Sequence, residues 1–237
     1  MKALLIIPAY NEEKNILNTC NKIIEYNKGK KEKIDFIVIN DGSTDKTSEI
    51  CYENNIPCIS LINNLGIGGA VQTGYKYALD NNYDIAIQFD GDGQHDVRYV
   101  NNIAEDIKKG TADMVIGSRF VGNSSDFKSS KARRVGINII SFFIKLVTGK
   151  KIYDTTSGFR AINKQLIAEF ASNYPAEYPE PVSTAWVLKR KYIVHEVDVK
   201  MHKRENGVSS IRAWKNVYYM FNVILSIIVV GLEENNK

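Results

Sequence analysis

Short apolar runs alternate with longer polar segments along much of the chain, and this alternation limits the fold more than any other feature. The runs are rich in Ile and Val and cover residues 3–8, 35–40, 57–62, 83–89 and 112–118, with a later one at 192–200. Between them lie segments with helical spacing of apolar residues, such as 12–27 and 97–109. Strands that alternate with helices predict crossover connections and a mostly parallel sheet. Because the runs are apolar throughout, we expect helices on both faces of that sheet.

The second half of the chain has a different character. A polar, basic stretch at 122–134 precedes an unusually apolar helical pattern at 136–149, and a Pro-rich loop is expected at 174–181. A chain of 237 residues is long enough for one large domain. We expect an α/β domain over residues 1–210 and a separate helical segment over 211–237.

The C-terminal segment is the most apolar part of the sequence. Residues 217–232 are interrupted only by Asn222, Ser226 and Gly231. In a helix this run extends about 24 Å, which is less than the ~30 Å hydrocarbon core of a bilayer. Aromatic and basic residues gather at its start: Arg212, Trp214, Lys215, Tyr218 and Tyr219. This composition predicts an amphipathic or membrane-anchoring helix; a helix buried in the core or in an oligomer is the alternative.

Charge and cysteine content exclude some classes of protein. The formal net charge of +4 is too small to indicate a nucleic-acid partner, but it is compatible with an anionic ligand or membrane surface. Cys20, Cys51 and Cys58 are odd in number and form no CxxC pair, which indicates buried thiols in a reducing cytoplasm. The N-terminal run meets Pro8 too early for a signal peptide, so it predicts a first strand.

Polar or glycine-rich residues follow each of the first five apolar runs. They occupy residues 8–13, 40–45, 63–70, 90–96 and 117–120. Ligands bind beyond the carboxyl ends of strands in open parallel sheets, so these segments predict a binding site. Ser43 and Thr44 are expected to cap a helix, and Asn11 is open to the same interpretation. Asp41 is better explained as an acceptor for a nucleobase or ribose.

The acidic stretch DGDGQHD at 90–96 predicts a metal site. Asp90 and Asp92 are two residues apart, so both carboxylates can face the same way in an extended strand tip. Two carboxylates that share a site repel each other, and a divalent cation removes that conflict. Gln94 adds a neutral oxygen, and oxygen ligands favour Mg²⁺ or Mn²⁺. An EF-hand does not fit, because His95 stands where that loop needs glycine. For His95 itself we expect a turn or a supporting hydrogen bond.

Together these motifs resemble the family 2 glycosyltransferases with the GT-A fold. The residues that carry the resemblance are PAYNEE, DGSTD, NLGIGGA, DGDGQHD, GSRF and DTTSGFR, which occur in the family's order over about residues 2–210. The likeness is strongest to the branch that makes polyprenyl-phosphate sugars, such as dolichyl-phosphate mannose synthase. The resemblance implies an inverting enzyme. It also implies nucleotide-binding roles for Pro8, Tyr10, Asn11, Glu12 and Asp41, and metal-binding roles for Asp90, Asp92 and Gln94.

The same resemblance implies roles for four arginines. Arg204 matches a donor-diphosphate position, while Arg119 and one of Arg133 and Arg134 match positions that bind an acceptor phosphate. We expect Asp92, Arg119 and Arg204 to be the catalytic residues. Val182 departs from the family pattern in the loop EYPEPV, so we assign that loop no catalytic role.

The charge of the acceptor decides the mechanism. A lipid phosphate has a second pKa of about 6 and is largely dianionic near pH 7, so it needs no general base. A sugar hydroxyl does need one, and Asp154 is the candidate for that role, with a structural carboxylate as its alternative.

We therefore predict transfer of a sugar from a UDP- or GDP-linked donor to a polyprenyl phosphate at the cytoplasmic face of the membrane. Two alternatives stay open: a polysaccharide-elongating transferase, and a non-catalytic membrane-tethered subunit that binds nucleotide sugar. A small membrane-protein partner or a homo-oligomer is also expected, and a nucleic-acid partner is not.

Overall fold

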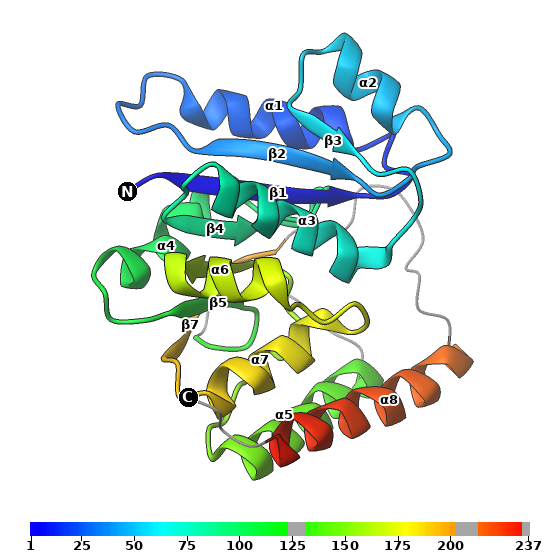
Figure 1. Cartoon of the computed structure of the whole chain (residues 1–237), viewed down its shortest axis with the longest axis vertical. Helices are drawn as coiled ribbons and strands as arrows, with labels where there is room; N and C mark the ends of the chain where they lie inside the picture. The colour runs from blue at the N-terminus through cyan, green and yellow to red at the C-terminus, as the bar shows by residue number, and fades with distance from the viewer. Residues whose placement is uncertain (123–130, 202–212, 234–237) are drawn as a thin grey trace.

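The structure is a computed structural model that describes residues 1–122, 131–201 and 213–233, with side chains left out of the description at 131–132 and 213–217. The described strands form one seven-stranded sheet in the order β3-β2-β1-β4-β6-β5-β7 (Figure 1). The strands are β1 (Ala3–Ala9), β2 (Asp35–Asn40), β3 (Cys58–Ser60), β4 (Ile85–Gln88), β5 (Met114–Ser118), β6 (Arg160–Asn163) and β7 (Val194–Asp198). All neighbouring strands are parallel except β6, which is antiparallel to both β4 and β5. The predicted α/β class and mostly parallel sheet are confirmed.

Helices cover both faces of the sheet, as the apolar strands predicted. They are α1 (Ile16–Asn27), α2 (Thr47–Glu53), α3 (Gly66–Asp80), α4 (Val100–Lys108), α5 (Lys131–Thr148), α6 (Lys164–Ser172), α7 (Pro179–Lys189) and α8 (Ala213–Leu232), with a short 3₁₀ turn at Val97–Tyr99. Successive strand residues point to opposite faces. Leu4 and Ile6 therefore join a core with α3, α6 and α7, while Leu5 and Ile7 join a second core with α1, α2 and α4.

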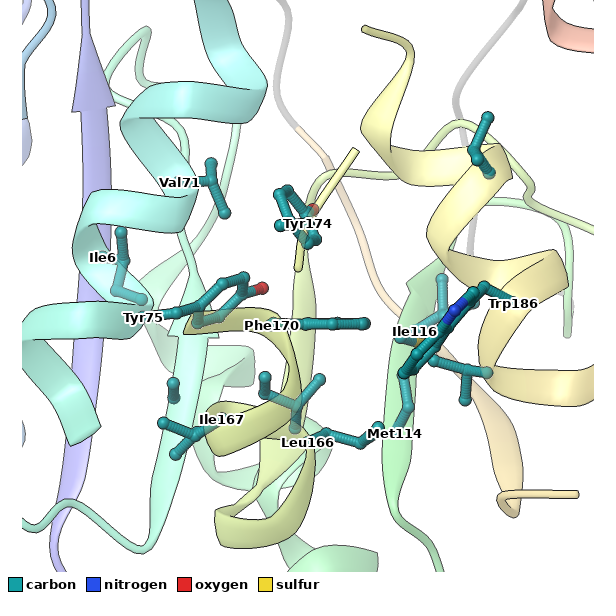
Figure 2. Packing of buried hydrophobic residues seen from close by; sticks show 14 of the residues in the cluster. Ile6, Val71, Tyr75, Met114, Ile116, Leu166, Ile167, Phe170, Tyr174 and Trp186 are labelled. Carbon is teal, nitrogen blue, oxygen red and sulfur yellow. The ribbon is translucent and has the colours of Figure 1, made fainter. Parts of the chain in front are cut away.

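Aromatic rings fill much of the first core (Figure 2). Phe170 of α6 lies between Tyr75 of α3 and Trp186 of α7, with ring centroids 5.5 and 5.8 Å away. Tyr174 completes the group, 4.9 Å from Phe170 in an edge-on arrangement. Because these rings come from three helices, they fix α7 against the rest of the domain.

Strand β6 was not predicted from the sequence. Its four residues RAIN begin with an arginine and form too short an apolar run to be recognised as a strand. In the structure Arg160 lies opposite Gln88 of β4, so the start of β6 reaches the carboxyl edge of the parallel strands. The antiparallel insertion thus brings residues 157–160 to the edge where ligands are expected.

Helices α5, α7 and α8 gather at one end of the molecule (Figure 1). The inner face of α8 buries Val223, Ile227 and Val230 in the first core, and Lys189 Nζ of α7 donates to Gly231 O at 2.8 Å. The outer faces of α5 and α8 carry exposed apolar side chains. These are Val135, Ile139, Phe142 and Leu146 on α5, and Phe221, Leu225, Ile228 and Leu232 on α8. Within the described ranges no helix is long and apolar enough to cross a bilayer.

The Pro-rich loop expected at 174–181 is shorter than predicted, because α7 begins inside it. Pro179 is the first helical residue of α7. Proline suits this position, since its fixed φ matches the helix and the missing N–H would have no partner there.

Candidate active site

The loops after β1 and β2 are hydrogen-bonded to each other. Asn11, in the left-handed region with φ of 55°, donates its backbone N–H to Ser43 Oγ at 3.0 Å. Its side-chain Oδ1 accepts from the backbone N–H of Thr44 at 2.8 Å. The predicted helix-capping role of Ser43 and Thr44 is wrong, because the N-cap of α2 is Lys46, whose side chain makes no capping hydrogen bond. Glu12 extends the contact by donating its N–H to Thr47 Oγ1 at 2.9 Å.

Asp41 lies at the tip of β2, only 3% exposed. Its Oδ1 accepts from the backbone N–H of Leu65 at 2.7 Å, which joins this strand end to the glycine-rich start of α3. Gly42 permits the close approach: it has φ of 64°, and a Cβ there would lie 2.7 Å from Asn64 N. Beside them Tyr10 is 48% exposed, a large flat ring at the carboxyl edge of β1 that follows the buried Pro8.

The buried side chain of His95 supports the acidic loop after β4 and is only 5% exposed. The backbone N–H of Asp90 donates to His95 Nδ1 at 2.9 Å, so the ring proton lies on Nε2. That Nε2 is 3.5 Å from Asp90 Oδ2, and the ring stacks on Phe159 with centroids 4.7 Å apart. His95 thus makes the predicted supporting hydrogen bond and orients Asp90.

The chemistry of this loop fits a divalent cation. Asp92 is 4% exposed and accepts from Gln94 N at 3.0 Å, while Asp90 is half-buried and lies beside Gly158. A Cβ at Gly158 would lie 3.1 Å from both Asp90 oxygens, so glycine leaves space at this carboxylate. Among the described residues no three His, Cys, Asp or Glu side chains form a metal-binding group. The predicted set has only two carboxylates, with an amide as its third ligand, which suits Mg²⁺ because this ion is usually shared with phosphates and water.

Arg119 and Asp154 form a buried ion pair at the end of β5. Arg119 Nε donates to Asp154 Oδ2 at 2.7 Å and Nη2 donates to Oδ1 at 2.6 Å, a bidentate geometry. Arg119 is 5% exposed and Asp154 fully buried. Both carboxylate oxygens of Asp154 are therefore occupied by Arg119, which supports the structural alternative for this residue over a role as general base.

Arg133 and Arg134 lie exposed in the first turn of α5. The guanidinium of Arg134 stacks on Phe120, 4.0 Å from the ring centroid. Partial burial, and after it repulsion from Arg119, lowers the pKa of Arg133. Arg119 also faces the Phe120 ring, with its guanidinium 5.4 Å from the centroid, so both Arg133 and Arg134 lie near Arg119. Arg204 lies outside the described residues.

Three polar residues that the sequence interpretation did not select meet beside the acidic loop. Gln88 Nε2 is 3.4 Å from both Asp90 Oδ1 and Glu180 Oε1, and so bridges them. Arg160, fully buried, donates from Nη1 to the carbonyl of Glu180 at 3.0 Å. Burial raises the pKa of Glu180, and Asp90 adds to the increase while Arg160 opposes it. Two sequence motifs touched this group: DTTSGFR ends at Arg160, and EYPEPV contains Glu180 but was assigned no catalytic role because of Val182.

The sheet order with its antiparallel insertion, and the acidic loop after β4, define the GT-A class of glycosyltransferase fold. The chain belongs to glycosyl transferase family 2, whose family model matches residues 4–170.

Its relatives agree with this class. The chain is 33% identical over 216 residues to the UDP-N-acetylglucosamine–dolichyl-phosphate N-acetylglucosaminyltransferase of Methanococcus voltae, covering 83% of this chain and 84% of that protein. It is 24% identical over 231 residues to the polyprenol monophosphomannose synthase of Mycolicibacterium smegmatis, covering 94% and 85%. Glucosyl-3-phosphoglycerate synthase from Mycobacterium tuberculosis, solved with Mn²⁺, UDP-glucose and phosphoglyceric acid, has a TM-score of 0.72 at 16% identity, covering 99% of this chain and 81% of that one. This last likeness is one of fold.

Proposed function

We propose that this family 2 glycosyltransferase moves a sugar, with inversion, from a UDP- or GDP-linked donor to a polyprenyl phosphate. One observation carries the proposal. Along the carboxyl edge of the sheet, the acidic loop of β4 stands between the polar loops of β1 and β2 and the arginines near β5. That order matches a ligand pair that is anionic at both ends, a donor diphosphate and an acceptor phosphate. The lipid phosphates named for the relatives support the choice of acceptor.

The donor is assigned to the β1–β4 half. Pro8, Tyr10, Asn11, Glu12 and Asp41 would hold the nucleotide. The exposed ring of Tyr10 offers a face on which a base can stack, and Asp41 Oδ2 is the oxygen not used by Leu65.

The diphosphate is assigned to the acidic loop. Asp90, Asp92 and Gln94 would hold Mg²⁺ or Mn²⁺, which when bound would offset charge on the leaving nucleoside diphosphate. Arg204 would assist there by the family resemblance.

The acceptor phosphate is assigned to Arg119, Arg133 and Arg134. The Asp154 carboxylate holds the guanidinium of Arg119 in place, while Arg133 and Arg134 in the first turn of α5 add two more guanidinium groups with forked donors. A dianionic phosphate is already nucleophilic, so these residues need only place it near the anomeric carbon. Asp92, Arg119 and Arg204 remain the catalytic residues of this proposal.

The apolar outer faces of α5 and α8 would meet the cytoplasmic face of the membrane. On α5 the exposed residues Val135, Ile139, Phe142 and Leu146 recur every three or four positions, the spacing of one helix face. Arg133 and Arg134 lie at the start of the same helix, where basic side chains can bind lipid phosphates. We therefore assign residues 1–210 to the glycosyltransferase domain, with α5 adding to its membrane contact, and 211–237 to a helix that packs on this domain and faces the membrane. A small membrane-protein partner or self-association stays a prediction.

The hydroxyl-acceptor alternative is disfavoured because its candidate base, Asp154, is bound on both oxygens by Arg119. The non-catalytic alternative is disfavoured because the polar loops and the acidic pair are both present.

The deciding experiment supplies polyprenyl phosphate and the dephosphorylated polyprenol side by side, with a panel of UDP- and GDP-sugars and Mg²⁺ or Mn²⁺. We expect transfer only to the phosphate, giving an acid-labile lipid-linked sugar phosphate. Equal transfer to both lipids, or transfer only to a saccharide hydroxyl, would reject the proposal.

A further inference from the structure

Glu180 stands in the first turn of α7, next to the acidic loop although 90 residues separate it from Asp90 in sequence. The link is Gln88, which is 1% exposed and donates to both carboxylates at 3.4 Å. Glu180 itself is half-buried. Within the described part of the chain, no side chain donates to its second oxygen, Oε2.

Arg160 fixes the backbone that carries this carboxylate. Its Nη1 donates to the Glu180 carbonyl at 3.0 Å, to Ser183 Oγ at 3.1 Å and to Thr184 Oγ1 at 3.3 Å. The opposite edge of the guanidinium donates to Ser157 O. A fully buried arginine with this many partners cannot turn toward a ligand, so its contribution is to hold the start of α7.

The order of the strands places Glu180 on the path of the donor. Asp90 comes shortly after the end of β4, and Arg119 directly follows β5. Strand β6 lies between these two strands in the sheet. Arg160 begins β6 and holds Glu180, so Glu180 lies next to the acidic loop on the side that leads to the arginines. A donor whose diphosphate rests at Asp90 and Asp92 and whose anomeric carbon faces an acceptor at Arg119 must carry its sugar over this position.

We propose that Glu180 accepts a hydrogen bond from a hydroxyl of the donor sugar and so helps to determine which sugar is transferred. The inference rests on the proposed donor class, but not on the identity of the acceptor. Carboxyl oxygens accept from hydroxyls in either protonation state, so the contact does not depend on titration. A hydrogen bond of this kind changes affinity by about twofold to tenfold.

The test compares nucleotide sugar with nucleotide alone. Calorimetric titration with Mg²⁺ would use UDP-N-acetylglucosamine, UDP-glucose or GDP-mannose, whichever the wild-type chain binds most tightly, and the matching diphosphate. We expect Glu180→Ala to weaken binding of the nucleotide sugar by up to about tenfold, and Glu180→Gln, which keeps an acceptor oxygen, to weaken it less. Both variants should bind the diphosphate within about twofold of wild type. Glu177→Gln, an exposed acid in the same loop, is the control and should change neither. The Gln variant keeps the side-chain volume, and thermal unfolding checks that each variant is folded.

A second readout removes the sugar hydroxyls instead. Wild type should lose affinity for one deoxy-sugar analogue of the chosen donor, whereas Glu180→Ala should not distinguish that analogue from the parent sugar. Equal weakening of diphosphate and nucleotide sugar would overturn the inference. If the Glu180 variants bound the donor normally but lost turnover, the inference would also be overturned. That result would favour Glu180 as a general base for a hydroxyl acceptor. If the wild-type chain bound no nucleotide or nucleotide sugar at all, the proposed function would fail as well, which separates the two failures.

Discussion

The two halves of the sheet edge are built differently. In the β1–β4 half, consecutive strands end in loops that bond to one another through backbone N–H groups, as Asn11 does with Thr44 and Asp41 with Leu65. In the β5–β7 half, the polar contacts are buried ion pairs and arginine networks, such as Arg119–Asp154 and those of Arg160. The first half therefore depends on parallel crossovers that bring every loop to one edge. The second depends on packing between segments far apart in the chain.

If the second half relies on buried charge, Asp154→Ala should give the largest effect on stability. Removing one partner leaves the nearly buried Arg119 without its counter-charge, which typically costs about 3–5 kcal/mol. Denaturant unfolding of the variant measures this loss. The exposed pair Lys109–Glu105 provides the control, since Lys109→Ala should change stability little. Similar losses for the two variants would erase the contrast between the halves.

If the first half holds the donor, Asp92→Ala should reduce nucleoside diphosphate affinity by about a hundredfold or more, because even residues that only support metal ligands contribute ten- to a hundredfold. Adding a chelator to the wild-type protein should have a comparable effect. Calorimetric titration measures both, with Asp106→Asn, on α4 away from the loop, as a matched control. Undiminished binding in chelator and in the variant would exclude the metal assignment.

If the second half binds the acceptor phosphate, substitutions there should change KM for polyprenyl phosphate and not the affinity for nucleotide. Arg133→Ala should raise the apparent KM for polyprenyl phosphate about tenfold to a hundredfold, because a charge-assisted contact is lost. Nucleotide binding should stay intact. Arg134→Ala is the informative comparison: since Arg134 stacks on Phe120, we expect the smaller increase in KM. A larger effect at Arg134 would reverse the assignment within the pair.

The smallest effect is expected at the membrane-facing helices. Phe142→Ser or Leu225→Ser should weaken binding to vesicles that contain anionic lipid by about tenfold each, since each removes apolar surface from the interface. Stability should hardly change, because both side chains are exposed in the free protein. Ile24→Ser on α1, at the other end of the molecule, is the control (Figure 1). Vesicle binding that is equal for all three variants would argue against α5 and α8 as the contact.

Prediction from sequence succeeded best where one short segment contains the whole signal. The first five apolar runs of the sequence correspond to β1 to β5, and the polar residues after them do lie at strand ends. Gln88 was not selected, because nothing local distinguishes it from an ordinary strand end. Glu180 was set aside together with the loop EYPEPV because of Val182, although its own position beside Asp90 depends on tertiary packing. Arg160 was noticed only as the last residue of the motif DTTSGFR. Strand β6 was not predicted, because its four residues RAIN form neither an apolar run nor an alternating pattern of useful length.

The sequence by itself determined the parallel α/β half, the acidic loop and the apolar C-terminal helix, because periodicity and strand-end chemistry are local properties. The tertiary structure alone decided three other points. It inserted β6 antiparallel between β4 and β5, so that Arg160 reached the ligand edge. It paired Asp154 with Arg119 in a buried ion pair, which cannot be read from the sequence because the two residues are 35 positions apart. It also placed Glu180 beside Asp90 through Gln88. Each of these depends on side chains distant in the chain, and the packing of α7 and β6 against the sheet brings them together.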